Sequence, residues 1–317
     1  MAMLTYFFGF GTQNALLRSE SGTVSAIAGI FKAPFDIIAD KLRGYLGLVT
    51  DLVERPDKVL AACEALMPHL LHVALSGADP AKEVPIGFWM HRGCVPFISN
   101  EQFKRFYWPT LKPIIEEIWR RGHQVLFYAE GDWNAHLGAF AELPDRSIVY
   151  HVDRADIFEA HRALGHKFCL SGGIPNYLLA YGTPDEVRAC CKKVIDGVAG
   201  NGGYIMDASA IIQNDAKVEN VRAMTDFTRD YGVYSGAAYT PQPTVSAETH
   251  NGTAPSQSAG GVLPGRATKM QPGVCLPWGQ IRAELPKISG DEALLQRVWE
   301  NIDALGYTYI WHCLLSF

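Results

Sequence analysis

The segment 125–133, VLFYAEGDW, carries the clearest structural signal in this chain. An apolar run of strand-forming residues ends directly on two acids, Glu130 and Asp132, which flank the permissive Gly131. A strand that presents carboxylates on a tight turn is typical of the rim of an active site. The same succession of short apolar run, polar or glycine-rich turn and amphipathic stretch recurs along the chain, which indicates a repeated β/α unit.

The composition allows one large core and excludes some kinds of partner. With 317 residues and 48% hydrophobic content, the chain can bury one large domain, with or without an appendage. The charged fraction is 19%, the net charge is -5, and no run of Lys and Arg occurs. Because nucleic-acid binding depends on concentrated positive charge, the sequence predicts no nucleic-acid partner.

The cysteines and the N-terminal stretch favour a soluble, cytoplasmic protein. The cysteines are odd in number and irregularly spaced without a CxxC pair, which fits reduced thiols better than a disulfide framework. No basic residue precedes Arg18, so the apolar start lacks the charged end of a signal peptide. No uncharged apolar run has the length that crosses a bilayer, so the sequence predicts no membrane association.

Strand-like and helix-like stretches alternate through most of the chain. The expected strands are the short apolar runs at 84–90, 124–128, 147–151, 167–170 and 204–206. Two expected helices are 51–75 and 134–143. A third is capped by Ser99 and Gln102 and interrupted by Pro109 and Pro113. Of the remaining three, one ends at Gly165, one begins at Thr183 and one ends at Gly232. Five β/α units are clear and 23–43 is the place for a sixth, whereas a closed barrel has eight.

These units predict an α/β fold of the TIM-type (β/α)8 barrel class over residues 1–235. Either the early strands are irregular, or the chain starts inside the fold and lacks N-terminal elements. Residues 236–273 are rich in Gly, Pro, Ser and Thr and predict a flexible linker. The tail, 274–317, contains a helical pattern at 291–305 and a strand-like run at 307–315, and we expect it to pack on the barrel or to form a subunit contact, as in a homodimer.

In parallel β/α barrels the functional groups lie at the carboxyl ends of the strands. Those positions hold carboxylates for acid/base chemistry and N, O and S atoms that could hold a metal: His91, Cys94, Glu130, Asp132, His151, Asp153, Ser171, Gly172, Gly173, Asp207 and Ser209. We expect catalytic roles for Glu130, Asp132 and Asp207. The residues expected to bind substrate are His91, Asp153, Ser171, Gly172, Gly173 and Ser209.

Several of these residues have structural alternatives. Glu130 and Asp132 could cap a helix, but their rim position favours function. Asp153 could equally well cap the helix that follows it. His151 fits a hydrogen-bonded barrel histidine slightly better than a ligand. The glycines at 172–173 could let backbone N–H groups approach an anion, or could simply allow a tight turn.

Six segments, in this order, resemble the uroporphyrinogen decarboxylase superfamily. They are FISNEQFKRFYWPTLKPII, QVLFYAEGDW, DIFEAHRALGHKFCLSGGIPNYLL, GTPDEVRACCKKVI, GGYIMDASAI and KVENVRAMTDFTRDYG. The likeness covers roughly 29–234 and is strongest to the branch of methylcobamide:coenzyme M methyltransferases and related corrinoid-dependent demethylase components. It implies a TIM-type barrel with its site at the carboxyl ends of the strands.

The resemblance also implies a zinc ion, which in this branch is bound by a His-x-Cys-Gly turn and a later cysteine and activates a thiol to accept methyl from a corrinoid. The matching positions here are Tyr128, Glu130 and Ala210, so only Glu130 keeps a zinc donor. Two alternatives stay open. Zinc is held differently, with Glu130, His151 or Asp207 as ligands, or it is absent.

The activity that the resemblance implies is methyl transfer between a methylated cobamide and a small acceptor. The expected cofactors are zinc and a cobalamin-type corrinoid, and the expected partners are a corrinoid carrier protein or free cobamide and a small-molecule methyl acceptor. Decarboxylation of a tetrapyrrole is an alternative, although the sequence has no counterpart of that enzyme's N-terminal arginine segment and its rim is acidic and neutral. A non-catalytic corrinoid-binding subunit is a third alternative.

Overall fold

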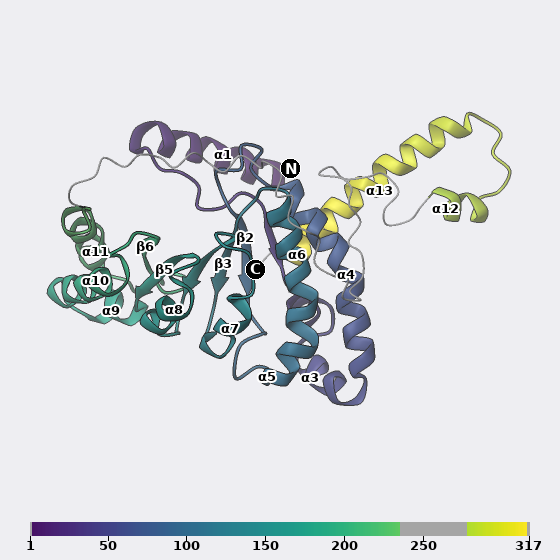
Figure 1. The fold of residues 1–317 in the computed structure, drawn as a ribbon. Helices are drawn as coiled ribbons and strands as arrows, with labels where there is room; N and C mark the ends of the chain where they lie inside the picture. Colours follow the sequence, from purple (N-terminus) through teal and green to yellow (C-terminus); the bar gives the residue numbers. More distant parts are fainter. Residues whose placement is uncertain (1, 235–277, 316–317) are drawn as a thin grey trace.

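Six parallel strands form one sheet with helices packed against it (Figure 1). The computed structural model describes residues 2–234 and 278–315. The strands follow the chain in the order β1 (Ile30–Lys32), β2 (Ile86–Met90), β3 (Val125–Ala129), β4 (Ile148–Val152), β5 (Cys169–Ile174) and β6 (Tyr204–Ala208). Each strand pairs in parallel with the next, so β1 and β6 are the edges of the described sheet. This partial TIM-type barrel confirms the predicted fold class, and β1 supplies the unit expected in 23–43.

The strand register separates the two faces of the sheet. On the face that packs against the helices, the buried rings of Phe31, Phe88 and Phe127 form a continuous row. The ring centroids are 4.9 Å apart for the first pair and 5.2 Å apart for the second. On the opposite face, at the level of the next residue of each strand, Trp89, Tyr128 and His151 form a second row. Their rings stack at 5.2 and 4.7 Å between centroids. Side chains alternate along a strand, so this second face is the interior of the barrel.

Helices occupy the connections between the strands. Those between β1 and β3 are α2 (Pro34–Ile37), a π-helical stretch (Ile38–Leu42), α3 (Tyr45–Glu54), α4 (Pro56–Ser76), α5 (Asn100–Gln102), a second π-helical stretch (Phe103–Tyr107) and α6 (Trp108–Arg120). Those after β3 are a 3-10 turn (Asn134–His136), α7 (Leu137–Phe140), α8 (Ile157–Leu164), α9 (Asn176–Tyr181), α10 (Pro184–Val198) and α11 (Val218–Tyr231). The chain begins with α1 (Ala2–Ser21), whose described side chains are all exposed.

The capping signals read from the sequence are confirmed. Ser99 with Gln102, and Thr183 with Glu186, form reciprocal capping boxes. Pro56 lies in the first turn of α4, where its missing N–H has no helical partner to lose.

The helix that Ser99 caps is interrupted ahead of Pro109, where a π-helical stretch, Phe103–Tyr107, precedes α6. The predicted interruption at Pro113 is wrong, because α6 runs unbroken over Trp108–Arg120. Pro109 lies in the first turn, where proline is tolerated. Across Pro113, the buried Ile114 and Ile115 hold the helix in the core. Tertiary burial therefore outweighs the one lost backbone hydrogen bond.

β5 extends further than predicted at its carboxyl end. The strand expected at 167–170 is observed as Cys169–Ile174, so Ser171, Gly172 and Gly173 lie within the strand and not on the turn after it. A Cβ on Gly172 would lie 2.4 Å from the carbonyl oxygen of Val152 on β4. Close packing of neighbouring strands therefore explains the glycine, and neither the tight turn nor the anion-binding turn is formed there.

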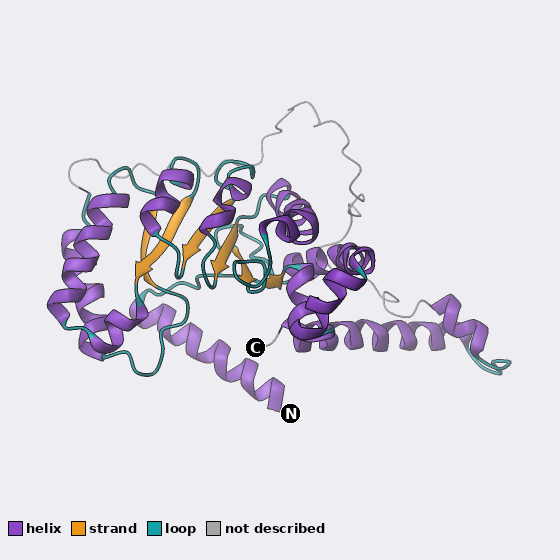
Figure 2. Cartoon of the chain, turned by 90° about the horizontal axis from the view of Figure 1, so that it is seen from below, coloured by secondary structure: helices purple, strands orange, loops and turns teal. Residues whose placement is uncertain are grey.

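The C-terminal tail consists of α12 (Trp278–Glu284) and α13 (Glu292–Leu315), and Figure 2 shows α12 projecting away from the body of the protein. The strand predicted for 307–315 is wrong, because this stretch is the last part of α13. The Tyr307 hydroxyl lies 3.0 Å from Nδ1 of His69 on α4, and the Trp311 ring stacks on the same histidine. A spacing of four residues places both aromatic rings on one helix face. The predicted linker, 236–273, lies outside the described residues.

Within the described residues one helix, α4, is long and apolar enough to cross a membrane. The helix carries Asp57, Lys58 and Glu64, so it is not the uncharged apolar run that the sequence analysis looked for. The apolar side of α4 is buried, and the helix contacts α2, α3, α6 and β1. It therefore packs as a core helix of the barrel.

Candidate functional site

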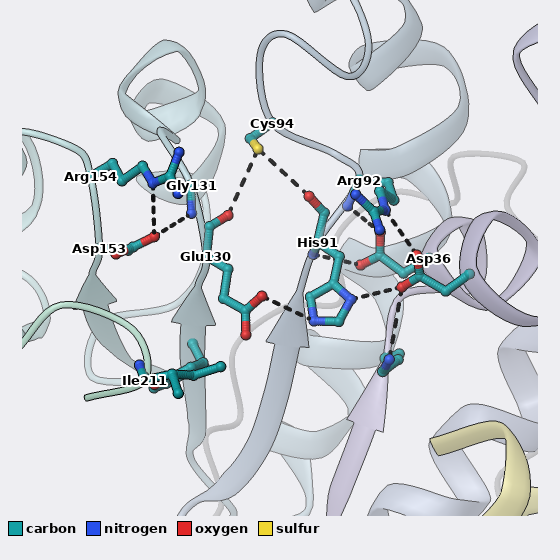
Figure 3. A network of polar contacts seen from close by, with 12 residues as sticks. Asp36, His91, Arg92, Cys94, Glu130, Gly131, Asp153, Arg154 and Ile211 are labelled. Atoms are coloured by element: carbon teal, nitrogen blue, oxygen red, sulfur yellow. Dashed lines mark hydrogen bonds and ion pairs between the residues drawn. The ribbon is translucent and has the colours of Figure 1, made fainter. Parts of the chain in front are cut away.

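A network of polar side chains joins the carboxyl ends of β1 to β4 (Figure 3). His91 directly follows β2 and Glu130 directly follows β3. His91 Nε2 lies 3.3 Å from Glu130 Oε2, and His91 Nδ1 lies 2.7 Å from Asp40 Oδ2. The imidazole is therefore held between two carboxylates from different segments of the chain.

This arrangement favours a protonated imidazole. Burial opposes the charge on His91, but hydrogen bonds to Asp40 and Glu130 outweigh it and raise the pKa of His91 to about 9. Burial also opposes the charge on Asp40, and hydrogen bonds from His91 and Arg92 overcome it and lower the pKa of Asp40 to about 2. At neutral pH the site thus holds a positive imidazolium beside a firmly ionised carboxylate.

Asp36 fixes the loop that carries His91. Its carboxylate is fully buried and accepts hydrogen bonds from the Tyr107 hydroxyl at 2.9 Å and from the backbone N–H groups of Arg92 at 2.8 Å and His91 at 3.2 Å. Burial raises the pKa of Asp36 to about 6. The buried Lys32 ammonium lies 3.8 Å from Asp40 Oδ2, and burial lowers the pKa of Lys32.

Asp153 connects three loops and does not cap a helix. Its Oδ2 accepts the N–H of Gly131 at 2.8 Å, and its Oδ1 accepts the N–H of Ala210 at 3.1 Å. The N-cap of α8 is Asp156, whose side chain accepts the backbone N–H groups of Phe158 and Glu159. The capping alternative for Asp153 is therefore wrong, and this side chain belongs to the candidate site.

Asp132 is separated from the His91 network. Its Oδ1 accepts the N–H of Asn134 at 3.0 Å, and its side chain is exposed. It makes no described contact with Glu130 or His91. The structure thus gives Asp132 the turn-capping role that was the alternative to function.

His151 lies in the barrel interior, almost completely buried. Its Nδ1 lies 3.3 Å from Ser171 Oγ and 3.6 Å from Asp207 Oδ2. Its Nε2 is buried and has no hydrogen-bond partner within the described residues. Burial lowers the pKa of His151, so this histidine is neutral, in contrast to His91.

Tyr128 connects the barrel interior with the rim. Its ring lies between Trp89 and His151, and its hydroxyl accepts the N–H of Ile211 at 2.6 Å. Ile211 has a φ of 56°, a left-handed conformation that is strained for a β-branched residue. The tyrosine therefore stabilises an unfavourable loop conformation beside the site.

Removing that hydroxyl has a measurable consequence. We expect Tyr128→Phe to lower the free energy of unfolding by about 0.5–1.5 kcal/mol, since the hydrogen bond that holds a strained, exposed loop is lost while the ring stack stays. Chemical denaturation measures the change, and hydrogen exchange at the Ile211 amide should accelerate. Tyr234→Phe, at an exposed tyrosine, is the control. Equal effects of the two changes would contradict the proposal that the Tyr128 hydroxyl stabilises the loop at Ile211.

Two cavities open at this end of the barrel. The first, of about 360 Å³, is lined by His91, Arg92, Phe97, Glu130, Gly131, Asp153, Arg154, Ala210, Ile211 and Gln213. The second, of about 790 Å³, includes Gly173 and Ser209 from the predicted set, and Ser209 donates its hydroxyl to the Asp153 carbonyl. The predicted residues Asp132, His151, Ser171, Gly172 and Asp207 line neither of these cavities.

The sequence analysis missed several residues of the network. Lys32, Asp36 and Asp40 come from one short segment, FKAPFDIIAD, in which the two acids are four residues apart, as on one helix face. Arg92 and Arg154 were also missed, so a purely acidic and neutral rim is wrong. Both arginines nevertheless lie against carboxylates, because Arg92 Nε is 2.8 Å from Asp40 Oδ1 and Arg154 Nε is 3.8 Å from Asp153 Oδ2.

The donor set does not fit a zinc ion. Within the described residues no three His, Cys, Asp or Glu side chains are grouped so that they could hold a metal, and the predicted pair of Glu130 and His151 is not joined by any described contact. Cys94 Sγ lies 3.6 and 3.8 Å from the backbone carbonyl oxygens of His91 and Glu130, so its S–H faces two backbone acceptors.

We expect purified protein to contain less than about 0.1 zinc per chain, because a stable structural or catalytic site needs three or four protein ligands. Elemental analysis by mass spectrometry measures the content after exhaustive dialysis against a chelator. A stoichiometric zinc content that survives the chelator would contradict this reading of the donor set.

The sheet and its network define a (β/α)-barrel protein whose candidate site lies at the carboxyl ends of the strands. The chain belongs to the uroporphyrinogen decarboxylase (URO-D) family, whose model matches residues 13–231 and confirms the resemblance to that superfamily. A methyltransferase from Methanosarcina mazei has a similar fold, with a TM-score of 0.55 at 16% identity. The likeness covers 69% of this chain and 62% of that chain, which is less than two thirds of the other protein. No curated protein matches the chain.

Proposed function

We propose that this chain is a methyltransferase that moves a methyl group between a cobamide and an oxygen or sulfur atom of a small molecule. The observation that carries the proposal is the position of His91, which lies between Asp40 and Glu130 in the wall of a cavity. Membership of the URO-D family and the likeness in fold to a methyltransferase support the reaction class.

The paired His91 and Glu130 form a proton store beside the cavity, that is, a pair of side chains that can both donate and accept a proton. A bound cobamide would supply the methyl acceptor in one direction and the methyl donor in the other. When the small molecule gives up its methyl group, its oxygen or sulfur keeps the bonding electron pair and takes a proton from His91 and Glu130. In the opposite direction the acceptor O–H or S–H gives its proton to this pair as its oxygen or sulfur takes the methyl group, and the electrons of the broken bond would stay on the cobamide. Asp40 and Asp36 orient His91, and no step passes through a zinc ion.

The other predicted residues have supporting places in this proposal. Asp153 orders the loops that line both cavities, and Gly173 and Ser209 line the second cavity. Asp207, at 3.6 Å from the histidine Nδ1, is a positioning residue for the buried His151. Asp132 has no catalytic role in this proposal, because it lies apart from the His91 network.

The proposal includes a partner and a compartment. A corrinoid carrier protein or free cobamide exchanges the methyl group, and the tail is the candidate contact of a homodimer. The cytoplasm fits this chemistry because reduced cobalt needs a reducing compartment, and the buried cysteines Cys63, Cys94 and Cys191 are free thiols.

The test is methyl transfer from methylcobalamin to simple thiols and phenols, followed through the absorbance of the corrin. We expect Glu130→Gln to lower the rate by roughly tenfold to a hundredfold, because glutamine still accepts a hydrogen bond from His91 but takes up no proton. Glu64→Gln, at an exposed position on α4, is the matched control. Unchanged turnover in Glu130→Gln would remove this residue from the mechanism.

Two rival functions give different outcomes in the same preparation. Formation of coproporphyrinogen from uroporphyrinogen would favour a decarboxylase, although Arg92 is bound to Asp40 and the described rim offers few other cations for a substrate with many carboxylates. Cobalamin binding without any methyl transfer would favour a non-catalytic corrinoid-binding subunit.

A further inference from the structure

We propose that the second cavity binds an anionic group, a carboxylate or a phosphate, of the small-molecule substrate. This cavity has a volume of about 790 Å³, and its lining follows the carboxyl ends of β4, β5 and β6. Two cations on different elements line it, Arg154 after β4 and Lys193 on α10. Only the identity of the ligand as the substrate rests on the proposed function, since anion binding itself does not require methyl transfer.

The second cavity adjoins the cavity at His91. The two share Asp153, Arg154, Ala210 and Gln213 in their linings. Figure 3 shows Arg154 and Asp153 on the side of Glu130 that faces away from Arg92. Arg154 therefore lies at the junction, and a molecule whose reactive end reaches Glu130 can extend past this arginine into the larger space.

The two carboxylates in this lining hydrogen-bond to backbone N–H groups. Asp153 accepts the N–H of Gly131 with one oxygen and the N–H of Ala210 with the other. Asp156 accepts two N–H groups at the start of α8 with one oxygen. Among the described residues only Asp153 pairs with a cation of this cavity, Arg154, at 3.8 Å.

The cations, by contrast, have donors to spare. Arg154 is exposed, its shortest approach to Asp153 is 3.8 Å, and its guanidinium makes no hydrogen bond to another described residue, so its N–H groups can donate to another acceptor. In the described ranges no carboxylate pairs with Lys193, whose Nζ lies 5.2 Å from the ring centre of Phe158. Phe158 lines the same cavity. A guanidinium and an ammonium on two walls of one polar cavity are suited to carboxylate or phosphate oxygens.

Calorimetric titration of the full chain with three probes tests the site: succinate, inorganic phosphate and the neutral succinamide. We expect wild type to bind at least one of the two anions and to bind succinamide at least about fivefold more weakly than the anion it prefers. Arg154→Gln and Lys193→Gln should each weaken anion binding by about fivefold or more. Lys192→Gln, at the neighbouring position on α10 where the lysine pairs with Asp196, should change it by less than about twofold.

The outcomes are separate from those of the methyl-transfer assay. Anion affinity that depends on Arg154 and Lys193 establishes the site, and the preferred probe tells carboxylate from phosphate, even where wild type transfers no methyl group. Failure of both anions to bind overturns the site. So does equal affinity for succinate and succinamide, or unchanged affinity in both variants, whether or not the protein transfers methyl groups.

Discussion

Replacement of His91 by glutamine lowers the rate of methyl transfer by about a hundredfold to ten-thousandfold, the range that a positioned proton donor contributes. Glutamine can keep hydrogen bonds to Asp40 and Glu130 but carries no transferable proton at the pH of the reaction. Because the pKa of His91 is raised to about 9, the wild-type rate of methyl removal from the small molecule should hold up to about pH 9 and then fall. Steady-state rates from pH 6 to 10 measure both effects.

The control for this change is His166→Gln, at an exposed histidine in the loop after α8. Circular dichroism and the unfolding midpoint establish that His91→Gln still folds. A folded His91→Gln protein with the wild-type rate and the wild-type pH profile would show that the imidazole is not the proton donor.

The β/α units could be predicted because each is encoded by neighbouring residues. Apolar runs, capping boxes such as Thr183 with Glu186, and a glycine after α8 are signals within one or two helical turns. The errors arose where a local signal has two meanings. Ser171 and the glycines at 172–173 resemble a turn, yet they continue β5 by pairing with the neighbouring strands, and Gly172 is glycine because Val152 leaves no room there for a Cβ.

The candidate site was predictable only in part for a related reason. Glu130, His91 and Asp153 could be named because each follows a strand, and parallel strands gather their carboxyl ends. The partners of His91 are not encoded in this way. Asp40 and Asp36 precede it by 51 and 55 residues and lie on helical segments, so only the packing of those segments against β2 brings them to the imidazole.

The same pairing makes stability depend on pH. In the unfolded chain the pKa of histidine is about 6.5, whereas in the folded chain that of His91 is about 9. The folded state therefore binds this proton more tightly. Below pH 6.5 both states are protonated and the stabilisation is complete, and it is lost as the pH rises towards 9. The pKa of Asp36 is raised to about 6, so its effect on stability changes with pH only below about pH 7. A window above pH 7 therefore separates His91 from Asp36.

We expect His91 to contribute a fall of about 2 kcal/mol in the free energy of unfolding between pH 7 and 8.5, at about 1.4 kcal/mol per pH unit. His91→Gln should be less stable than wild type at pH 7, and its slope should be shallower by this amount, because only the buried cysteines, whose pKa burial also raises, still bind their protons more tightly in the folded state in that window. Urea denaturation at fixed ionic strength and several pH values gives the slope directly, with His166→Gln as the variant that keeps it. A slope that is the same in all three proteins would mean that the carboxylates of Asp40 and Glu130 do not hold the proton on His91, and the proton store of the proposed mechanism would lose its physical basis.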